Sequence, residues 1–127
     1  MKIYKDQNLE IRWEVEHKLL INRFLRKHVI MKEVAQFTGA IELLSPNSVM
    51  LDMSKVESME KYAKDLLVDD LTMQLQGRGV KKFALLRSYN NEINEFIFSL
   101  FQGDKMPKKL DIKDFVDEKQ ALAWLIV

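Results

Sequence analysis

Apolar and polar residues alternate near the start of the chain. Four apolar residues occupy every second position of the segment 8–15, namely Leu9, Ile11, Trp13 and Val15. This period of two is typical of a strand that is buried on one face only. A second apolar segment, residues 19–24, follows after three polar residues. We expect the two segments to form an antiparallel hairpin, because strands joined by so short a connection pair with each other.

The apolar period changes to three and four residues after Met31. The residues that carry this period are Val34, Phe37, Ile41 and Leu44. They predict a helix over residues 31–44, and Ser45-Pro46-Asn47 ends it because proline cannot continue a helix. Residues 48–53 are then almost wholly apolar, as in a central strand whose two faces are both covered.

Helices and strands alternate through the rest of the chain. The predicted segments are a helix from about Met59 to Gln76, a strand over 80–86, a helix capped by Ser88 or Asn90 and ended by Gly103, a strand over 110–112 and a helix capped by Asp117. Gly77-Arg78-Gly79 supplies glycines where the first of these helices needs a left-handed residue to end. The predicted order is thus two strands followed by helices and strands that alternate regularly.

The element order is therefore β-β-α-β-α-β-α-β-α. The later strands are separated by helical crossovers, so we expect them to be parallel, whereas the first pair is antiparallel. Residues 1–127 have the length of one ordinary domain. The prediction is a single-domain α/β two-layer sandwich with a mixed five-stranded sheet.

The charge composition argues against a nucleic-acid partner. Twenty basic and nineteen acidic residues give a net charge of +1, and the two signs are interleaved along the chain. The densest basic segment, KMPKK at 105–109, is followed at once by acidic residues, and we expect it to be a solvated loop. No segment approaches the ~20 consecutive apolar residues of a membrane span or has the apolar region of a signal peptide. We therefore expect a cytoplasmic protein without a membrane span.

The sequence offers little for catalysis. No cysteine is present, which excludes disulfides, thiol catalysis and cysteine-ligated metal. His17 and His28 are the only histidines, and neither has the spacing that brings two metal ligands together, so we expect both to be solvated. Gly77-Arg78-Gly79 follows a helix and precedes a strand, the reverse of a phosphate-binding loop. We expect no enzyme activity, no metal and no cofactor.

The segment VMLDMSKVESMEKYA, residues 49–63, resembles the STAS domains of bacterial anti-sigma-factor antagonists. In those domains a strand ending in L-D-L-S-G-V leads to I-D-S-S-G at the start of the next helix. The segments NLEIRWEVEHKLLINRF and FVDEKQALAWL are similar to the broader SpoIIAA-like group, which is linked by fold to the CRAL-TRIO lipid carriers. The resemblance covers nearly the whole chain and implies a domain that binds other proteins.

The phosphate-accepting serine of that motif has no counterpart here. An ungapped match places Asp52 and Ser54 on the strand-end aspartate and the serine after it, and Lys61 and Tyr62 on the motif's two serines. The resemblance therefore does not imply the usual phosphorylation switch. Ser54 and Ser58 remain near the expected helix start, where serine is also a good N-cap. We expect a cap at one of them.

The sequence favours a non-enzymatic domain that acts through contacts with a protein partner, with a regulatory role. We expect its contact surface at the loop after the Asp52 strand and at the start of the next helix, with Ser54, Ser58, Lys61 and Tyr62. A homodimer is a further expectation. In a phosphorylated switch, which is a separate hypothesis, Ser54, Ser58 or Tyr62 would accept the phosphate.

The alternative is a carrier or sensor of a small apolar ligand, such as a lipid or an acyl chain. The distant CRAL-TRIO resemblance implies it, and the chain has seven phenylalanines and seven methionines. The candidate pocket residues are Met31, Met50, Met53 and Phe98. They would surround an adaptable apolar site near the C-terminal ends of the strands.

Overall fold

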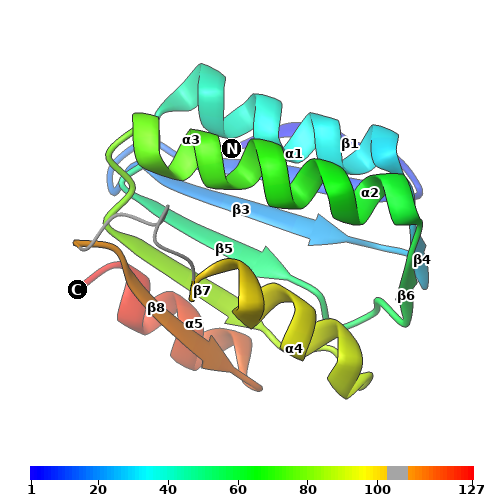
Figure 1. Ribbon diagram of the computed structural model, residues 1–127. Helices are drawn as coiled ribbons and strands as arrows, with labels where there is room; N and C mark the ends of the chain where they lie inside the picture. The colour runs from blue at the N-terminus through cyan, green and yellow to red at the C-terminus, as the bar shows by residue number, and fades with distance from the viewer. Residues whose placement is uncertain (103–108) are drawn as a thin grey trace.

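A computed structural model describes residues 1–102 and 109–127, which include a mixed six-stranded sheet (Figure 1). Its strands, in spatial order, are β1 (Lys2–Lys5), β2 (Leu9–Glu14), β3 (Leu19–Phe24), β5 (Ser48–Asp52), β7 (Lys82–Leu86) and β8 (Asp111–Phe115). The pairs β1–β2 and β2–β3 are antiparallel, and the remaining pairs are parallel. The predicted α/β class, mixed sheet and hairpin are confirmed. Gly103 lies outside the described residues, and so does most of the segment 105–109, which is expected to be a solvated loop.

The sheet has one strand more than the five that the sequence predicts. The additional strand, β1, has three exposed residues out of four, so it lacks the apolar alternation that reveals a half-buried strand. Backbone pairing with β2 holds it, and the Trp13 N–H donates to the Met1 carbonyl next to it. An edge strand of this kind is defined by its neighbour more than by its own side chains.

Five helical segments cover one face of the sheet. They are α1 (Met31–Leu44), then α2 (Lys61–Leu66), η1 (Leu67–Leu71) and α3 (Thr72–Gly77), which follow one another without a break, and α4 (Asn91–Leu100). Figure 1 shows α1 beside the α2–α3 helix on this face, while α5 (Glu118–Leu125) lies across the sheet from them. The two expected layers are present, and α5 adds partial cover to the other face.

Two apolar cores follow from this arrangement. The helix-layer core lies between the sheet and α1–α4, and the α5 core lies between the sheet and α5. Alternate residues of β5 enter different cores, Leu51 the first and Met50 the second, and all five residues of the strand are buried. This two-sided burial explains why residues 48–53 lack a polar period.

The ends of the helices follow the sequence closely. Asn90 accepts a hydrogen bond from the Glu92 N–H at the start of α4, and Asp117 caps α5 in the same way through the Lys119 N–H. Gly79 has a φ of 72° just after α3, which confirms the predicted left-handed residue. None of the helices among the described residues has both the length and the apolar character needed to cross a membrane.

The helix predicted from Met59 begins two residues later, at Lys61. Ser58–Met59 forms a short strand, β6, which pairs in parallel with β4 (His28–Val29) in a separate two-stranded sheet. The helix is delayed because both residues are held in extended conformation by this partner. A strand pair of two residues each has no periodic pattern that the sequence could reveal.

Candidate functional site

The C-terminal ends of β3, β5, β7 and β8 meet at one edge of the sheet, where open α/β sheets tend to bind ligands. Two adjacent pockets lie in the loops at this edge. We call the residues that line them the strand-end surface: Leu25, Lys27, Ser54, Lys55, Val56, Glu57, Arg87, Ser88, Tyr89, Asn91, Asn94 and Val116. Ser54 and Tyr89 line both pockets. This edge therefore joins four loops into one surface.

Ser54 is held by the end of its own strand. Its backbone N–H and its Oγ both donate to Oδ1 of Asp52, at 2.9 and 2.6 Å. The N-cap of α2 is Glu60, whose side chain makes no capping hydrogen bond. The predicted serine cap is therefore wrong for Ser54, because its hydroxyl closes a turn on Asp52 seven residues before α2 begins.

Ser58 is not a helix cap either. It lies in β6, and its Oγ is 2.8 Å from Nδ1 of His28 in β4. Lys61 and Tyr62 follow as the first two residues of α2, where both are exposed, Tyr62 to 66%. Neither side chain has a hydrogen bond or an ion pair with another described residue. Of the four predicted contact residues, Ser54 lies in the strand-end surface and the other three follow it along the chain.

Tyr89 is the most prominent residue of this surface, and the sequence analysis missed it. Its side chain is 98% exposed, and Val116 on the neighbouring loop is 87% exposed. Tyr89 stands between Ser88 and Asn90 in the loop that joins β7 to α4. An aromatic residue in a polar loop after a buried strand is the signal that could have revealed it.

The loop that carries Tyr89 is fixed by buried hydrogen bonds. Asn94 accepts the Ser88 N–H at 2.9 Å through Oδ1 and donates to the Ser88 carbonyl at 2.8 Å through Nδ2. The Ser88 Oγ donates to the carbonyl of Val56 and accepts the Asn90 N–H. The backbone on both sides of Tyr89 is therefore tied down, while its ring extends into solvent.

A network of charged side chains fixes Asp52, which in turn holds Ser54 of the strand-end surface. The Arg23 guanidinium donates to Oδ2 of Asp52 at 3.0 Å and also pairs with Glu118 and Glu10. Burial lowers the pKa of Arg23, but its contacts with Glu118 and Asp52 raise the pKa further, so the net shift is above the ordinary value. Asp52 is thus fixed between a permanent cation and the Ser54 turn.

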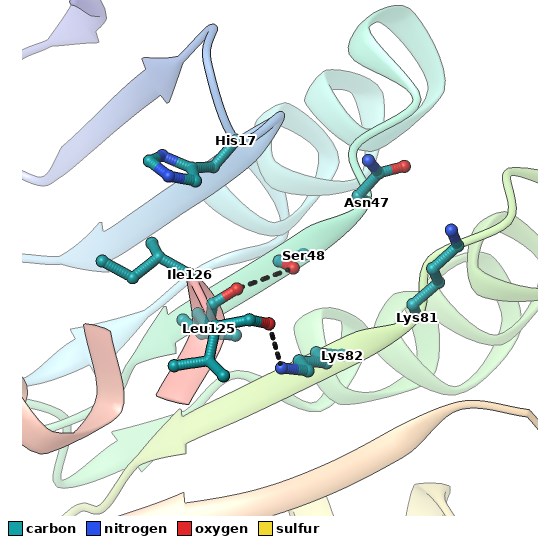
Figure 2. Close-up of a pocket in the computed structure, with 8 residues that line it drawn as sticks. His17, Asn47, Ser48, Lys81, Lys82, Leu125 and Ile126 are labelled. Carbon is teal, nitrogen blue, oxygen red and sulfur yellow. Dashed lines mark hydrogen bonds between the residues drawn. The ribbon is translucent and has the colours of Figure 1, made fainter. Parts of the chain in front are cut away.

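A third pocket lies at the opposite edge of the sheet, where the parallel strands begin (Figure 2). His17, Asn47, Ser48, Lys81 and Lys82 line it together with the last residues of the chain. The Lys82 ammonium already donates to the carbonyls of Trp124 and Val127, and the Ser48 hydroxyl donates to that of Leu125. Lys82 and Ser48 therefore complete the end of α5, whereas the exposed Lys81 side chain makes no hydrogen bond or ion pair with the described residues.

The hairpin turn beside this pocket brings together three side chains of the kinds that bind metals. Carboxylate oxygens of Glu14 and Glu16 and a ring nitrogen of His17 lie within 4.8 Å of one another. The Glu14 carboxylate accepts the backbone N–H groups of Glu16 and His17 and contacts the His17 ring. Both histidines of the chain are exposed, as predicted. These contacts of Glu14 close the hairpin turn, and they explain why the three side chains lie together.

The residues proposed for an apolar ligand pocket are dispersed. Met50 lies in the α5 core and Met53 in the helix-layer core, on opposite faces of the sheet. Met31 is half exposed at the start of α1, and Phe98 packs on the helix-layer core. One cavity cannot be lined by both Met50 and Met53, because the sheet separates them.

Comparisons with known proteins agree with the topology. No protein-family model matches the chain, and no curated protein matches its sequence. Solved structures do match. An uncharacterized DUF3478-family protein with a SpoIIAA-like fold from Shewanella loihica PV-4 has a TM-score of 0.61 and 19% identity, covering 92% of this chain and 91% of that chain. The phosphorylated form of the Bacillus cell fate determinant SpoIIAA has a TM-score of 0.63 and 15% identity, covering 92% and 98%.

The protein has a SpoIIAA-like fold. A chain of the complex between the diguanylate cyclase SiaD and its activator SiaC from Pseudomonas aeruginosa also matches, with a TM-score of 0.54 and 13% identity over 91% of this chain and 99% of that chain. The resemblance in the sequence is thereby confirmed at the level of the fold. Identities this low carry no residue roles from one SpoIIAA-like protein to another.

Proposed function

We propose that the protein is a non-enzymatic regulatory domain that binds a protein partner through the strand-end surface and the start of α2. The exposure of Tyr89, 98% on a loop fixed at both sides, carries the proposal. An aromatic ring buries a large area at an interface, and tyrosine is enriched among the residues that contribute most of the binding energy. The fixed backbone reduces the entropy lost on binding.

Neighbouring residues extend the proposed interface. Tyr62 and Lys61 are exposed at the start of α2, and Val116 is exposed beside Tyr89 across the second pocket. Ser54 lies between the two pockets, and Ser58 lies in β6 just before α2. The solved structures with this fold include anti-sigma factor antagonists and the complex of SiaD with its activator SiaC, which supports a role in protein contacts.

The test compares variants in affinity purification from cells that naturally make the protein. We expect Tyr89→Ser and Lys61→Glu each to reduce the yield of co-purified partner about tenfold or more, with an unfolding temperature close to that of the unaltered protein, because both side chains are exposed. Leu43→Ser is the matched control, since Leu43 is 81% exposed on the last turn of α1.

Partner capture and unfolding temperature together distinguish the loss of a binding surface from the loss of folding. If Tyr89→Ser and Lys61→Glu capture the same proteins as the unaltered chain and the Leu43→Ser control, the strand-end surface is not the binding site. The predicted homodimer stays a prediction, and so does phosphorylation of Ser54, Ser58 or Tyr62. Native mass spectrometry of the same preparations measures both.

A further inference from the structure

The larger pocket of the strand-end surface has walls of mixed chemistry. Leu25, Val56 and the Tyr89 ring supply apolar walls, and Lys27, Lys55 and Glu57 supply charged ones, around a cavity of ≈ 340 Å³. This volume is at the low end for pockets that take whole small molecules, about 300–1,000 Å³. An apolar side chain of a bound segment would bury the exposed ring of Tyr89 and contact Leu25 and Val56.

The charges around the two pockets are mainly positive. Lys27, Lys55 and Arg87 are basic, and Glu57 is the single acidic residue among those that line them. Arg87 is paired with Asp114 at 2.9 Å, whereas the Lys27 ammonium is 4.0 Å from the Glu57 carboxylate and both of these side chains are largely exposed. A pair so long and so exposed contributes little. Lys55 is exposed and has no acidic partner among the described residues.

Lys61 adds a further cation along the chain from this pocket. It is exposed at the start of α2 and lacks an ion pair with the rest of the described chain. A basic partner would place its cations against Lys55 and Lys61, and Glu57 is the single acidic residue of the pocket walls that could attract it. An acidic partner would pair with the unengaged lysines, and complementary charge of this kind sets both specificity and association rate.

We infer that the partner segment is acidic and carries one large apolar side chain. The apolar side chain enters the cavity between Tyr89, Leu25 and Val56, and flanking carboxylates bind Lys55 and Lys27. This inference rests on the proposed function, since it specifies the chemistry of the partner at the same surface. Segments that are basic, or apolar without charge, are the competing occupants.

The test is a selection from a random peptide library displayed on phage, with the full-length protein as bait. We expect enriched peptides to combine Asp or Glu with Leu, Phe or Trp, and fluorescence anisotropy to give affinities that weaken with added salt. Lys55→Glu should weaken a selected peptide about tenfold, since it replaces an attraction by a repulsion. Tyr89→Ser should weaken it at least as much.

Lys81→Glu is the control, because it makes the same change of net charge at the opposite edge of the sheet. An equal loss of affinity in Lys81→Glu and Lys55→Glu would mean that only net charge matters and would overturn the inference. Enrichment of basic or uncharged peptides, or no enrichment at all, would overturn it as well. The proposed function would still stand if partner capture from cells depended on Tyr89 and Lys61, so the two failures are distinguishable.

Discussion

Asn22 should lower the stability of the protein. It lies in β3 between Ile11 of β2 and Leu51 of β5, both of which belong to the helix-layer core. Its side chain is 0% exposed, and neither Oδ1 nor Nδ2 has a hydrogen-bond partner among the described residues. Leucine has nearly the same branched shape and no polar atoms. We therefore predict that Asn22→Leu stabilises the fold.

The magnitude follows from two opposing effects. A buried amide without partners costs about 1–3 kcal/mol on scales derived from protein variants. The two methyl groups of leucine are slightly larger than the amide atoms, and the resulting crowding reduces the gain in stability by up to about 1 kcal/mol. The expected net gain is about 1–2 kcal/mol, or a rise of about 4–8 °C in the unfolding temperature for a chain of this size.

Urea unfolding measures this gain directly, and Asn94 provides the control. Asn94 is also buried, but its amide is fully bonded to the backbone of Ser88. Asn94→Leu should therefore destabilise the protein by about 1–3 kcal/mol, because it leaves two buried backbone groups unpaired. The reasoning is refuted if Asn22→Leu lowers the urea midpoint at unchanged slope, or if both variants change stability in the same direction.

Three further predictions concern charge and mass. Arg23→Met should cost about 2 kcal/mol in urea unfolding, because it leaves the Asp52 carboxylate without its cation, and an unchanged midpoint would contradict this. The hydrogen bond from His17 is the main cause that holds the pKa of Glu14 below its ordinary value of 4.5. The ionised Glu14 therefore stabilises the fold at pH values above its unfolded-state pKa, and this stabilisation is lost as the pH falls through its folded-state pKa. An NMR titration of Glu14 should give a midpoint below the ordinary value, and His17→Ala should move that midpoint upward. Native mass spectrometry should detect no added mass of several hundred daltons, because Met50 lies across the sheet from the other proposed pocket methionine; such a mass would restore the apolar-ligand carrier.

Much of the fold could be predicted because its main elements have strong periods. The helix at 31–44 and the strand at 48–52 were read from side chains that are buried on definite faces. Three short strands, β1, β4 and β6, were not predicted. Their edge position and their pairing define them, whereas their own side chains are mostly exposed and have no regular apolar period. The strand number and the start of α2 were wrong for that reason.

The candidate site could be predicted only in part. The strand C-terminal edge near Asp52 followed from topology, and Ser54 does lie there. The serine cap was wrong, because Ser54 bonds to Asp52 and Ser58 contacts His28. Tyr89 was missed because its importance depends on exposure and on tertiary contacts from Val56 and Asn94 to its loop. Such contacts join segments far apart in the sequence and have no local pattern.

Site-specific photocrosslinking in living cells tests the central claim most directly. A photoreactive phenylalanine analogue at position 89 lies in the proposed interface, and the same analogue at position 43 lies on an exposed helix turn away from it. The account predicts a discrete covalent adduct from position 89 that is absent from position 43 and that Lys61→Glu reduces. An adduct from position 43 alone, or no adduct from position 89 under any growth condition, would contradict a partner site at the strand-end surface.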